Sequence, residues 1–193
     1  MSVTRKPLTG AGDPRPTREV PASLVPGAPF PDLALADHAG NDRRLSEVVG
    51  GDPALVHFYR GWWCPKEQAF FRRLVALQEE AEVAYTRFVS ISVDPPETAA
   101  AFRAGLGARW TFLCDHERRA IGRLGLRETT DTVNDPYRPA AFTLAADGDS
   151  IEIHRTYNGY WFWGRPTAEE LRRDLREISM RIRPDWEPPP PAA

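Results

Sequence analysis

Cysteine is scarce in this chain of 193 residues, which contains only Cys64 and Cys114. Two cysteines are too few for a disulfide framework, so we expect a reducing, cytoplasmic compartment. No apolar run is long enough to span a membrane, and none follows Met1 as a signal peptide would require. The formal net charge of −2 gives no reason to expect a nucleic acid or a membrane as partner.

Recognisable metal-ligand spacing is also missing. Histidine, cysteine and carboxylate residues do not cluster along the sequence as metal ligands do, so we predict no metal and no cofactor. His57 lies inside an apolar run and shares one face with Leu55 and Tyr59. That position is more typical of a core histidine with satisfied hydrogen bonds than of a catalytic one.

The chain length suits a single domain, which at this size buries roughly 70% of the unfolded surface. Residues 1–24 are rich in proline, glycine, threonine and charge, and we predict a flexible N-terminal arm there. Residues 184–193 contain Trp186 and four consecutive prolines, which predicts an extended, proline-rich tail. The domain itself is expected over residues 25–183.

Within this domain, strand and helix patterns alternate. Strands are predicted at 32–35, 54–59, 86–93, 110–113, 140–145 and 151–157, and helices at 65–81, 96–106 and 118–124. A last helix is expected to carry Leu171, Leu175, Ile178 and Ile182 on one face. A capping box at Thr167–Glu170 begins the last helix, and Asp147-Gly148-Asp149 is typical of a hairpin turn. This order predicts an α/β layer sandwich with parallel crossovers and a C-terminal hairpin.

Cys64 is placed where a strand passes into a helix. It follows a continuous apolar run at 54–59, typical of a buried central strand, and it precedes Pro65, which suits the first position of a helix. Free backbone N–H groups and the helix dipole favour an anion there, and the thiolate is the reactive form of cysteine. We predict that Cys64 is a nucleophile; the alternative is a small buried residue that fills space.

Four segments carry a resemblance to a known family: Pro26–Leu33, His57–Pro65, Val89–Asp94 and Arg138–Phe142. The second is similar to an active site of the form Arg-Gly-x-Trp-Cys-Pro-x-Cys. Together, over about residues 26–182, the segments resemble the alkyl hydroperoxide reductase/thiol-specific antioxidant (peroxiredoxin-like) family of thioredoxin-fold redoxins. The resemblance implies a thioredoxin-like three-layer α/β/α sandwich with a mixed central sheet.

The chain departs from the family pattern at three positions. Glu67 stands where the dithiol subgroup has its second cysteine, so the four-residue disulfide of those enzymes cannot form. Gly61 replaces the threonine found three residues before the peroxidatic cysteine. Pro139 takes the place of an arginine before the hairpin strand, and it resembles the cis-proline that faces the active-site sulfur in thioredoxins.

The resemblance implies an antioxidant oxidoreductase that reduces hydroperoxides through Cys64. The thiolate would attack the peroxide and become a sulfenic acid, which an external thiol would then reduce. Two alternatives stay open: exchange with a disulfide substrate through mixed disulfides, and a redoxin-fold binding module without turnover. Redoxins often pair, so a homodimer is compatible with the sequence.

Four more residues are candidates for this chemistry. Arg60 and Arg138 would stabilise the leaving alkoxide or hydroxide, unless they are ordinary surface arginines. Glu67, one helical turn after Cys64, would position water or shuttle a proton, or would merely favour the helix dipole. Cys114 ends a strand expected at the same sheet edge as Cys64; it is either a resolving thiol or a buried spectator.

Aromatic residues are concentrated in one connection, with five in the seven residues 157–163. They would wall an apolar substrate pocket or anchor a partner protein, or simply pack over the sheet edge. The pocket residues that we predict are Trp62, Trp63, Pro139, Tyr160, Trp161 and Trp163.

Overall fold

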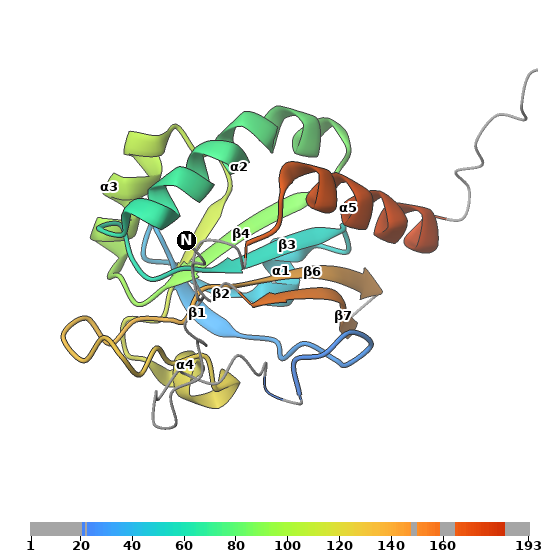
Figure 1. The fold of residues 1–193 in the computed structure, drawn as a ribbon. Helices are drawn as coiled ribbons and strands as arrows, with labels where there is room; N and C mark the ends of the chain where they lie inside the picture. The colour runs from blue at the N-terminus through green and yellow to red at the C-terminus, as the bar shows by residue number, and fades with distance from the viewer. Residues whose placement is uncertain (1–20, 22, 148–149, 159–164, 184–193) are drawn as a thin grey trace, which may run out of the picture.

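The computed structural model describes residues 21, 23–147, 150–158 and 165–183, and its fold is drawn in Figure 1. A seven-stranded mixed sheet forms the centre, in the order β2-β1-β5-β4-β3-β6-β7. The strands are β1 (Ala34–Asp37), β2 (Asp42–Arg44), β3 (Ala54–Phe58), β4 (Arg87–Ser92), β5 (Thr111–Cys114), β6 (Ala140–Asp147) and β7 (Ser150–Asn158). The helices are α1 (Leu45–Val49), α2 (Pro65–Val83), α3 (Pro96–Leu106), α4 (Arg119–Leu124) and α5 (Ala168–Ile182).

Three parallel strands, β3, β4 and β5, make up the middle of the sheet. Their C-terminal ends therefore meet at one edge, where ligands bind in sheets of this kind. The strands on either side of this middle pair antiparallel, in the pairs β3–β6, β6–β7, β1–β5 and β1–β2. The parallel crossovers, the C-terminal hairpin and the mixed sheet were all expected, and all are present.

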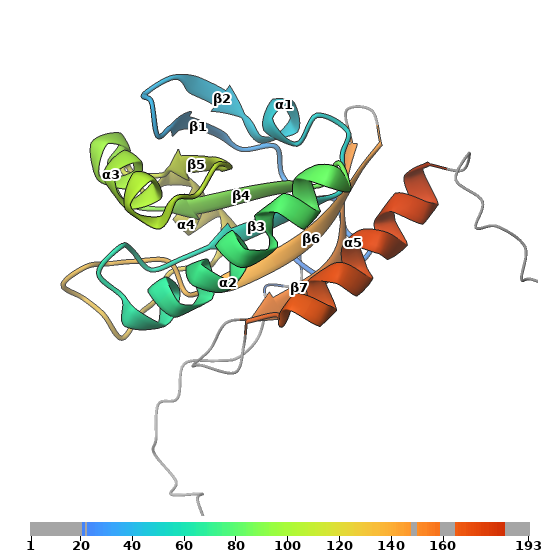
Figure 2. The same ribbon diagram turned by 90° about the horizontal axis from the view of Figure 1, so that it is seen from above.

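Helices cover both faces of the sheet, so the fold has the three predicted layers (Figures 1 and 2). On one face a hydrophobic cluster joins α2, α3 and α5 to side chains such as Leu55 and Tyr59 of the β3 region. On the other face α1 and α4 pack against Ala54, Val56 and Phe58. Every residue of β3 is buried, because a central strand with both faces covered has no exposed side.

Most element positions agree with the expectations from sequence, and the differences have physical causes. Helix α3 has the predicted bounds, and α5 begins with the predicted capping box at Thr167. β2 and α1 are not predicted from the sequence, since three polar residues and one short helical turn have too little periodicity to detect. Leu24, which falls within the predicted arm, is 1% exposed and belongs to the core.

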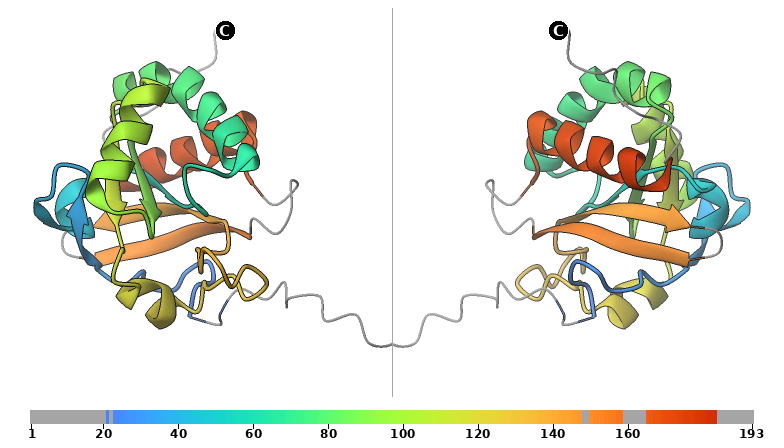
Figure 3. Two further views of the ribbon diagram at one scale, coloured as in Figure 1. Left: turned by 90° about the vertical axis from the view of Figure 1, so that its left-hand side faces the viewer. Right: turned by 90° about the vertical axis from the view of Figure 1, so that its right-hand side faces the viewer.

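The β6–β7 hairpin lies beside α5, as the side views show (Figure 3). Within the described part of the chain, no helix has the length and apolar character that crossing a bilayer requires.

Candidate active site

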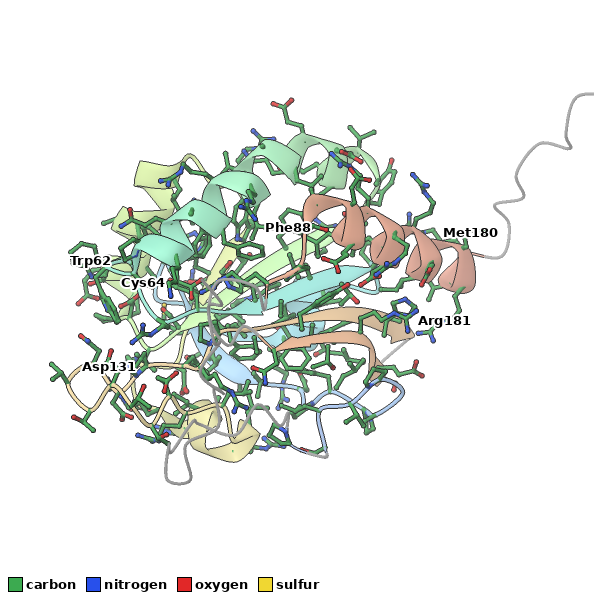
Figure 4. The ribbon with its side chains drawn as sticks, in the orientation of Figure 1. Trp62, Cys64, Phe88, Asp131, Met180 and Arg181 are labelled. Carbon is green, nitrogen blue, oxygen red and sulfur yellow. The ribbon has the colours of Figure 1, made fainter. Side chains whose placement is uncertain are left out.

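Cys64 is the N-cap residue of α2 (Figure 4). Its backbone is extended, and Pro65 follows at the first helical position, as the sequence predicted. The Cys64 N–H donates to the carbonyl of Gly61 at 3.2 Å, and the Cys64 carbonyl accepts the first helical bond from Gln68 at 3.1 Å. The residue is 3% exposed, yet it is not a member of either hydrophobic cluster of the described residues. Its side chain is therefore buried at the start of the helix.

Gly61 shapes the loop that leads from β3 to Cys64. Its φ is +149°, a region that residues with a Cβ atom rarely adopt. A Cβ atom at this position would lie 2.6 Å from Nε1 of Trp63. The loop therefore needs glycine where typical family members have threonine.

We expect Gly61→Ala to lower the free energy of unfolding by about 1–3 kcal/mol, the cost of a strained backbone residue. The matched control is Gly105→Ala in α3, where an added Cβ atom meets nothing within 4 Å. That change should instead stabilise the protein by about 0.5–1 kcal/mol. Urea denaturation of both variants measures the difference, and equal effects would mean that the Gly61 conformation is not required.

Glu67 forms a buried ion pair one helical turn from Cys64. Its side chain is 0% exposed, and its two carboxylate oxygens contact the guanidinium of Arg165. One of these contacts is a hydrogen bond of 3.2 Å from Nε of Arg165 to Oε2. On the other side, Nε2 of His57 lies 3.3 Å from the same oxygen. Glu67 of α2, His57 of β3 and Arg165 from the connection before α5 thus meet at the start of α2.

The charges of this cluster follow from its surroundings. Burial lowers the pKa of His57, and Arg165 adds to this effect while Glu67 opposes it. Burial alone would raise the pKa of Glu67, but His57 and Arg165 outweigh it and lower that pKa. The cluster therefore holds a neutral imidazole, a carboxylate and a guanidinium. The negative charge of Glu67 is balanced by the guanidinium of Arg165.

The structure changes two expectations from the sequence, those for His57 and Glu67. The sequence predicts a core histidine with satisfied hydrogen bonds at position 57; His57 is buried, but neither ring nitrogen has a hydrogen bond of good geometry among the described residues. Glu67 is enclosed and paired, which favours a positioning role over proton shuttling through solvent. The sequence does not single out Arg165, because nothing local distinguishes it among 25 lysines and arginines.

Arg60 and Arg138 both lie at this edge of the sheet. Arg60 donates to Asp131 at 2.7 Å and stacks on Trp63, with its guanidinium carbon 4.9 Å from the ring centroid. Arg138 is 7% exposed, and burial lowers its pKa although Glu128 opposes the shift. Arg60 follows the end of β3 and Arg138 precedes the start of β6, and these two strand ends pair at Phe58 and Ala140.

The peptide bond before Pro139 is trans, since the described residues contain no cis peptide bond. This corrects the expected likeness to the thioredoxin cis-proline. The reason lies in the preceding backbone: the Arg138 N–H donates to the carbonyl of Leu126 at 2.6 Å, and the Glu128 N–H donates to that of Pro136 at 3.0 Å. This short antiparallel pairing carries the chain into β6 in an extended conformation.

Asp94 anchors the loop before Cys64 through a hydrogen bond to its backbone. It follows β4, and its carboxylate accepts hydrogen bonds from the Trp62 N–H at 3.3 Å and from the Ser92 hydroxyl at 3.1 Å. Burial raises the pKa of Asp94 despite these bonds. Ser92 and Asp94 are both buried, and Ser92 pairs in register with Cys114 of β5.

Cys114 is 2% exposed, packs in the hydrophobic cluster beneath α2 and carries a free thiol, as does Cys64. Burial, with the nearby charge of Asp94 second, raises the pKa of the Cys114 thiol to about 12. A thiol that rarely ionises is a poor nucleophile. These observations favour the spectator over the resolving cysteine.

We expect Cys114 to resist alkylation in the native protein. With a pKa of about 12 rather than 9.0, the thiolate fraction at pH 8 falls roughly 1000-fold, and the rate should keep rising with pH well above 9. The Cys64→Ser variant isolates this thiol, and iodoacetamide labelling followed by mass spectrometry measures it. Labelling in the native state as fast as in urea would contradict the expectation.

The predicted aromatic pocket is described only in part. Trp62 is 51% exposed and Trp63 is partly buried under Arg60. Tyr160, Trp161 and Trp163 lie outside the described residues, so the pocket that they would form stays a prediction.

One group of possible metal ligands comes together only in three dimensions. His154, Asp174 and Glu177 place their ligand atoms within 4.8 Å of one another. Each is already bonded, since His154 contacts Glu177 at 2.9 Å and Asp174 accepts from the Tyr157 hydroxyl at 2.6 Å. Arg173 also donates to Asp174, so the group is explained as a hydrogen-bond network.

The mixed sheet covered by helices on both faces, with a cysteine at a helix start beside its parallel strands, is the architecture of a thioredoxin-like fold. The structure of peroxidoxin BcpB from Mycobacterium tuberculosis is similar with a TM-score of 0.67 at 18% identity, over 81% of this chain and 97% of that one. Enterococcus faecalis AhpC is similar with a TM-score of 0.67 at 17% identity, over 87% and 99%.

The sequence comparison is more specific than this likeness of fold. The model of the AhpC/TSA family matches residues 26–152. A protein of Mycobacterium tuberculosis, provisionally named a peroxiredoxin, is 28% identical over 125 residues, which cover 63% of this chain and 79% of the relative. The chain belongs to the AhpC/TSA family, and the predicted family and fold are confirmed.

Proposed function

We propose that the protein is a thiol-dependent peroxidase in which Cys64 is the reacting residue. The observation that carries this proposal is the position of Cys64, at the N-cap of α2 and at the C-terminal edge of three parallel strands in an AhpC/TSA protein. Reactive cysteines in other proteins are found at helix N-termini. The alternative of a binding module is less well supported, because both the family and the position of the cysteine agree with turnover.

The proposed cycle takes up one proton at the leaving oxygen and consumes two molecules of an external thiol. The Cys64 thiolate attacks the distal oxygen of a hydroperoxide, so the O–O bond breaks and an S–O bond forms. The alkoxide or hydroxide that leaves takes up a proton and departs as an alcohol or water. An external thiol then displaces water from the sulfenic acid to give a mixed disulfide, and a second thiol releases Cys64 with formation of the reductant's disulfide.

Each neighbouring residue supports one part of this reaction. Arg60 and Arg138 bring positive charge to the sheet edge where the leaving oxygen becomes negative, which is the charge that such a step must stabilise. The buried pair of Glu67 and Arg165 holds the first turn of α2, which directly follows Cys64. Cys114 has no part in the proposed cycle.

Treatment with one equivalent of hydroperoxide tests the proposal. Intact mass should increase by one oxygen atom, and a sulfenic-acid reagent such as dimedone should label Cys64 by peptide mapping. A free thiol retained on Cys64 would refute the peroxidase proposal. If Cys64 captures glutathione disulfide faster than it consumes hydroperoxide, thiol–disulfide exchange is the better description.

A further inference from the structure

A groove of about 400 Å³ lies far from Cys64, between the C-terminal half of α2 and α5. Apolar side chains line it, among them Leu77, Ala81, Leu175 and Met180. Tyr85, just beyond α2, is 66% exposed at the groove, and Met180 is 48% exposed; Figure 4 labels Met180 near the end of α5. Exposed apolar side chains that gather around a hollow usually mark a binding surface.

The charged residues of the groove are mainly positive. Three arginines line it, and the only acid in its lining among the described residues is Glu80. Arg172 pairs with Glu80 at 2.9 Å, and Arg183 pairs with Asp52 at 2.7 Å. Arg176 is exposed and has no ion-pair partner among the described residues. The groove therefore suits an occupant that combines an apolar group with negative charge.

Residues 184–193 have this composition and begin beside the groove. They include Trp186 flanked by Asp185 and Glu187, with no lysine or arginine. They directly follow Arg183, which lines the groove. From Arg183 back to Arg172 is about 16 Å along α5 at 1.5 Å per residue, whereas ten extended residues span up to about 33 Å.

The other segments outside the described residues fit less well. Residues 1–20 hold four positive and two negative side chains, so their charge repels the arginines. Residues 159–164 are uncharged and join Asn158 to Arg165, at the opposite end of α5 from Arg183. Charge and reach therefore select the C-terminal segment.

We propose that residues 184–193 dock in cis into the groove between α2 and α5, with Trp186 against the apolar lining and Glu187 beside Arg176. Even a contact of low affinity would keep the segment docked, because its short covalent link to α5 gives it an effective concentration on the order of millimolar at the groove. The docked segment would cover the exposed apolar surface. It would also brace α2, whose first turn carries Cys64, against α5.

Fluorescence of the full-length protein tests this docking. Subtracting the spectrum of Trp186→Phe from that of wild type isolates the emission of Trp186, which should be blue-shifted and protected from acrylamide. Arg176→Glu should lower the docked-to-free ratio about two- to fivefold, as expected for an exposed ion pair. The swap Arg176→Glu with Glu187→Arg should restore it, whereas Arg123→Glu, an equal charge change on α4, should have no effect.

Two results would overturn the proposal. The first is Trp186 emission and quenching in the folded protein equal to those in urea. The second is protection of Trp186 that disappears on dilution together with a halved molecular mass, which would assign the groove to the segment of a second copy. Neither result bears on the peroxidase proposal, which the reaction of Cys64 tests independently.

Discussion

Replacing Cys64 by serine is expected to reduce the rate of hydroperoxide consumption about 1000-fold or more, as is usual when an enzyme loses its nucleophile. The variant should also give no sulfenic-acid adduct. The fold should persist, because Cys64 is an N-cap residue and serine is among the preferred residues there. Peroxide consumption in the presence of excess dithiothreitol measures the rate, and circular dichroism checks the fold.

Cys114→Ala is the matched control for this experiment, because it removes the other sulfur of the chain. We expect the control to consume peroxide at close to the wild-type rate, because the thiol of Cys114 is buried and its pKa is raised to about 12. Equal loss of activity in the two variants would show that Cys114 takes part in turnover. An unchanged rate in Cys64→Ser would remove Cys64 from the mechanism.

Arg165→Met is expected to be the most destabilising change at the site. It leaves the carboxylate of Glu67, which is 0% exposed, without its cation. Removing one partner of a buried ion pair typically lowers the free energy of unfolding by about 3–5 kcal/mol. Urea denaturation at pH 7 measures the loss. It should shrink as the pH falls and Glu67 becomes protonated in the variant.

The double variant Glu67→Met with Arg165→Met separates charge from packing. Since apolar residues often replace a buried ion pair at little cost, most of the lost stability should return. Arg109→Met, which breaks the exposed pair with Glu82, should leave stability nearly unchanged. An equally unstable double variant would show that packing, not the buried charge, causes the loss. If the stable double variant reduces peroxide slowly, the pair also positions Cys64.

Local sequence signals account for much of the fold. The apolar run of β3, the proline after Cys64 and the capping box at Thr167 each depend on residues close together in the chain, so periodicity and capping rules identify them. The same rules fail for β2 and α1, which are too short to show a period. They also cannot determine the isomer before Pro139, because pairing with a neighbouring segment decides it.

The sequence by itself determined the order of strands and helices, from which the layer architecture is predicted, and the placement of one cysteine at a helix start, because periodicity and capping signals lie within a few residues of one another. The tertiary structure decided which charges surround that cysteine. Arg165 reaches Glu67 across 98 positions, and Arg60 reaches Asp131 across 71. The packing of helices and loops against the sheet determines which charged residues become partners. The spacing of these residues along the chain does not reveal that packing.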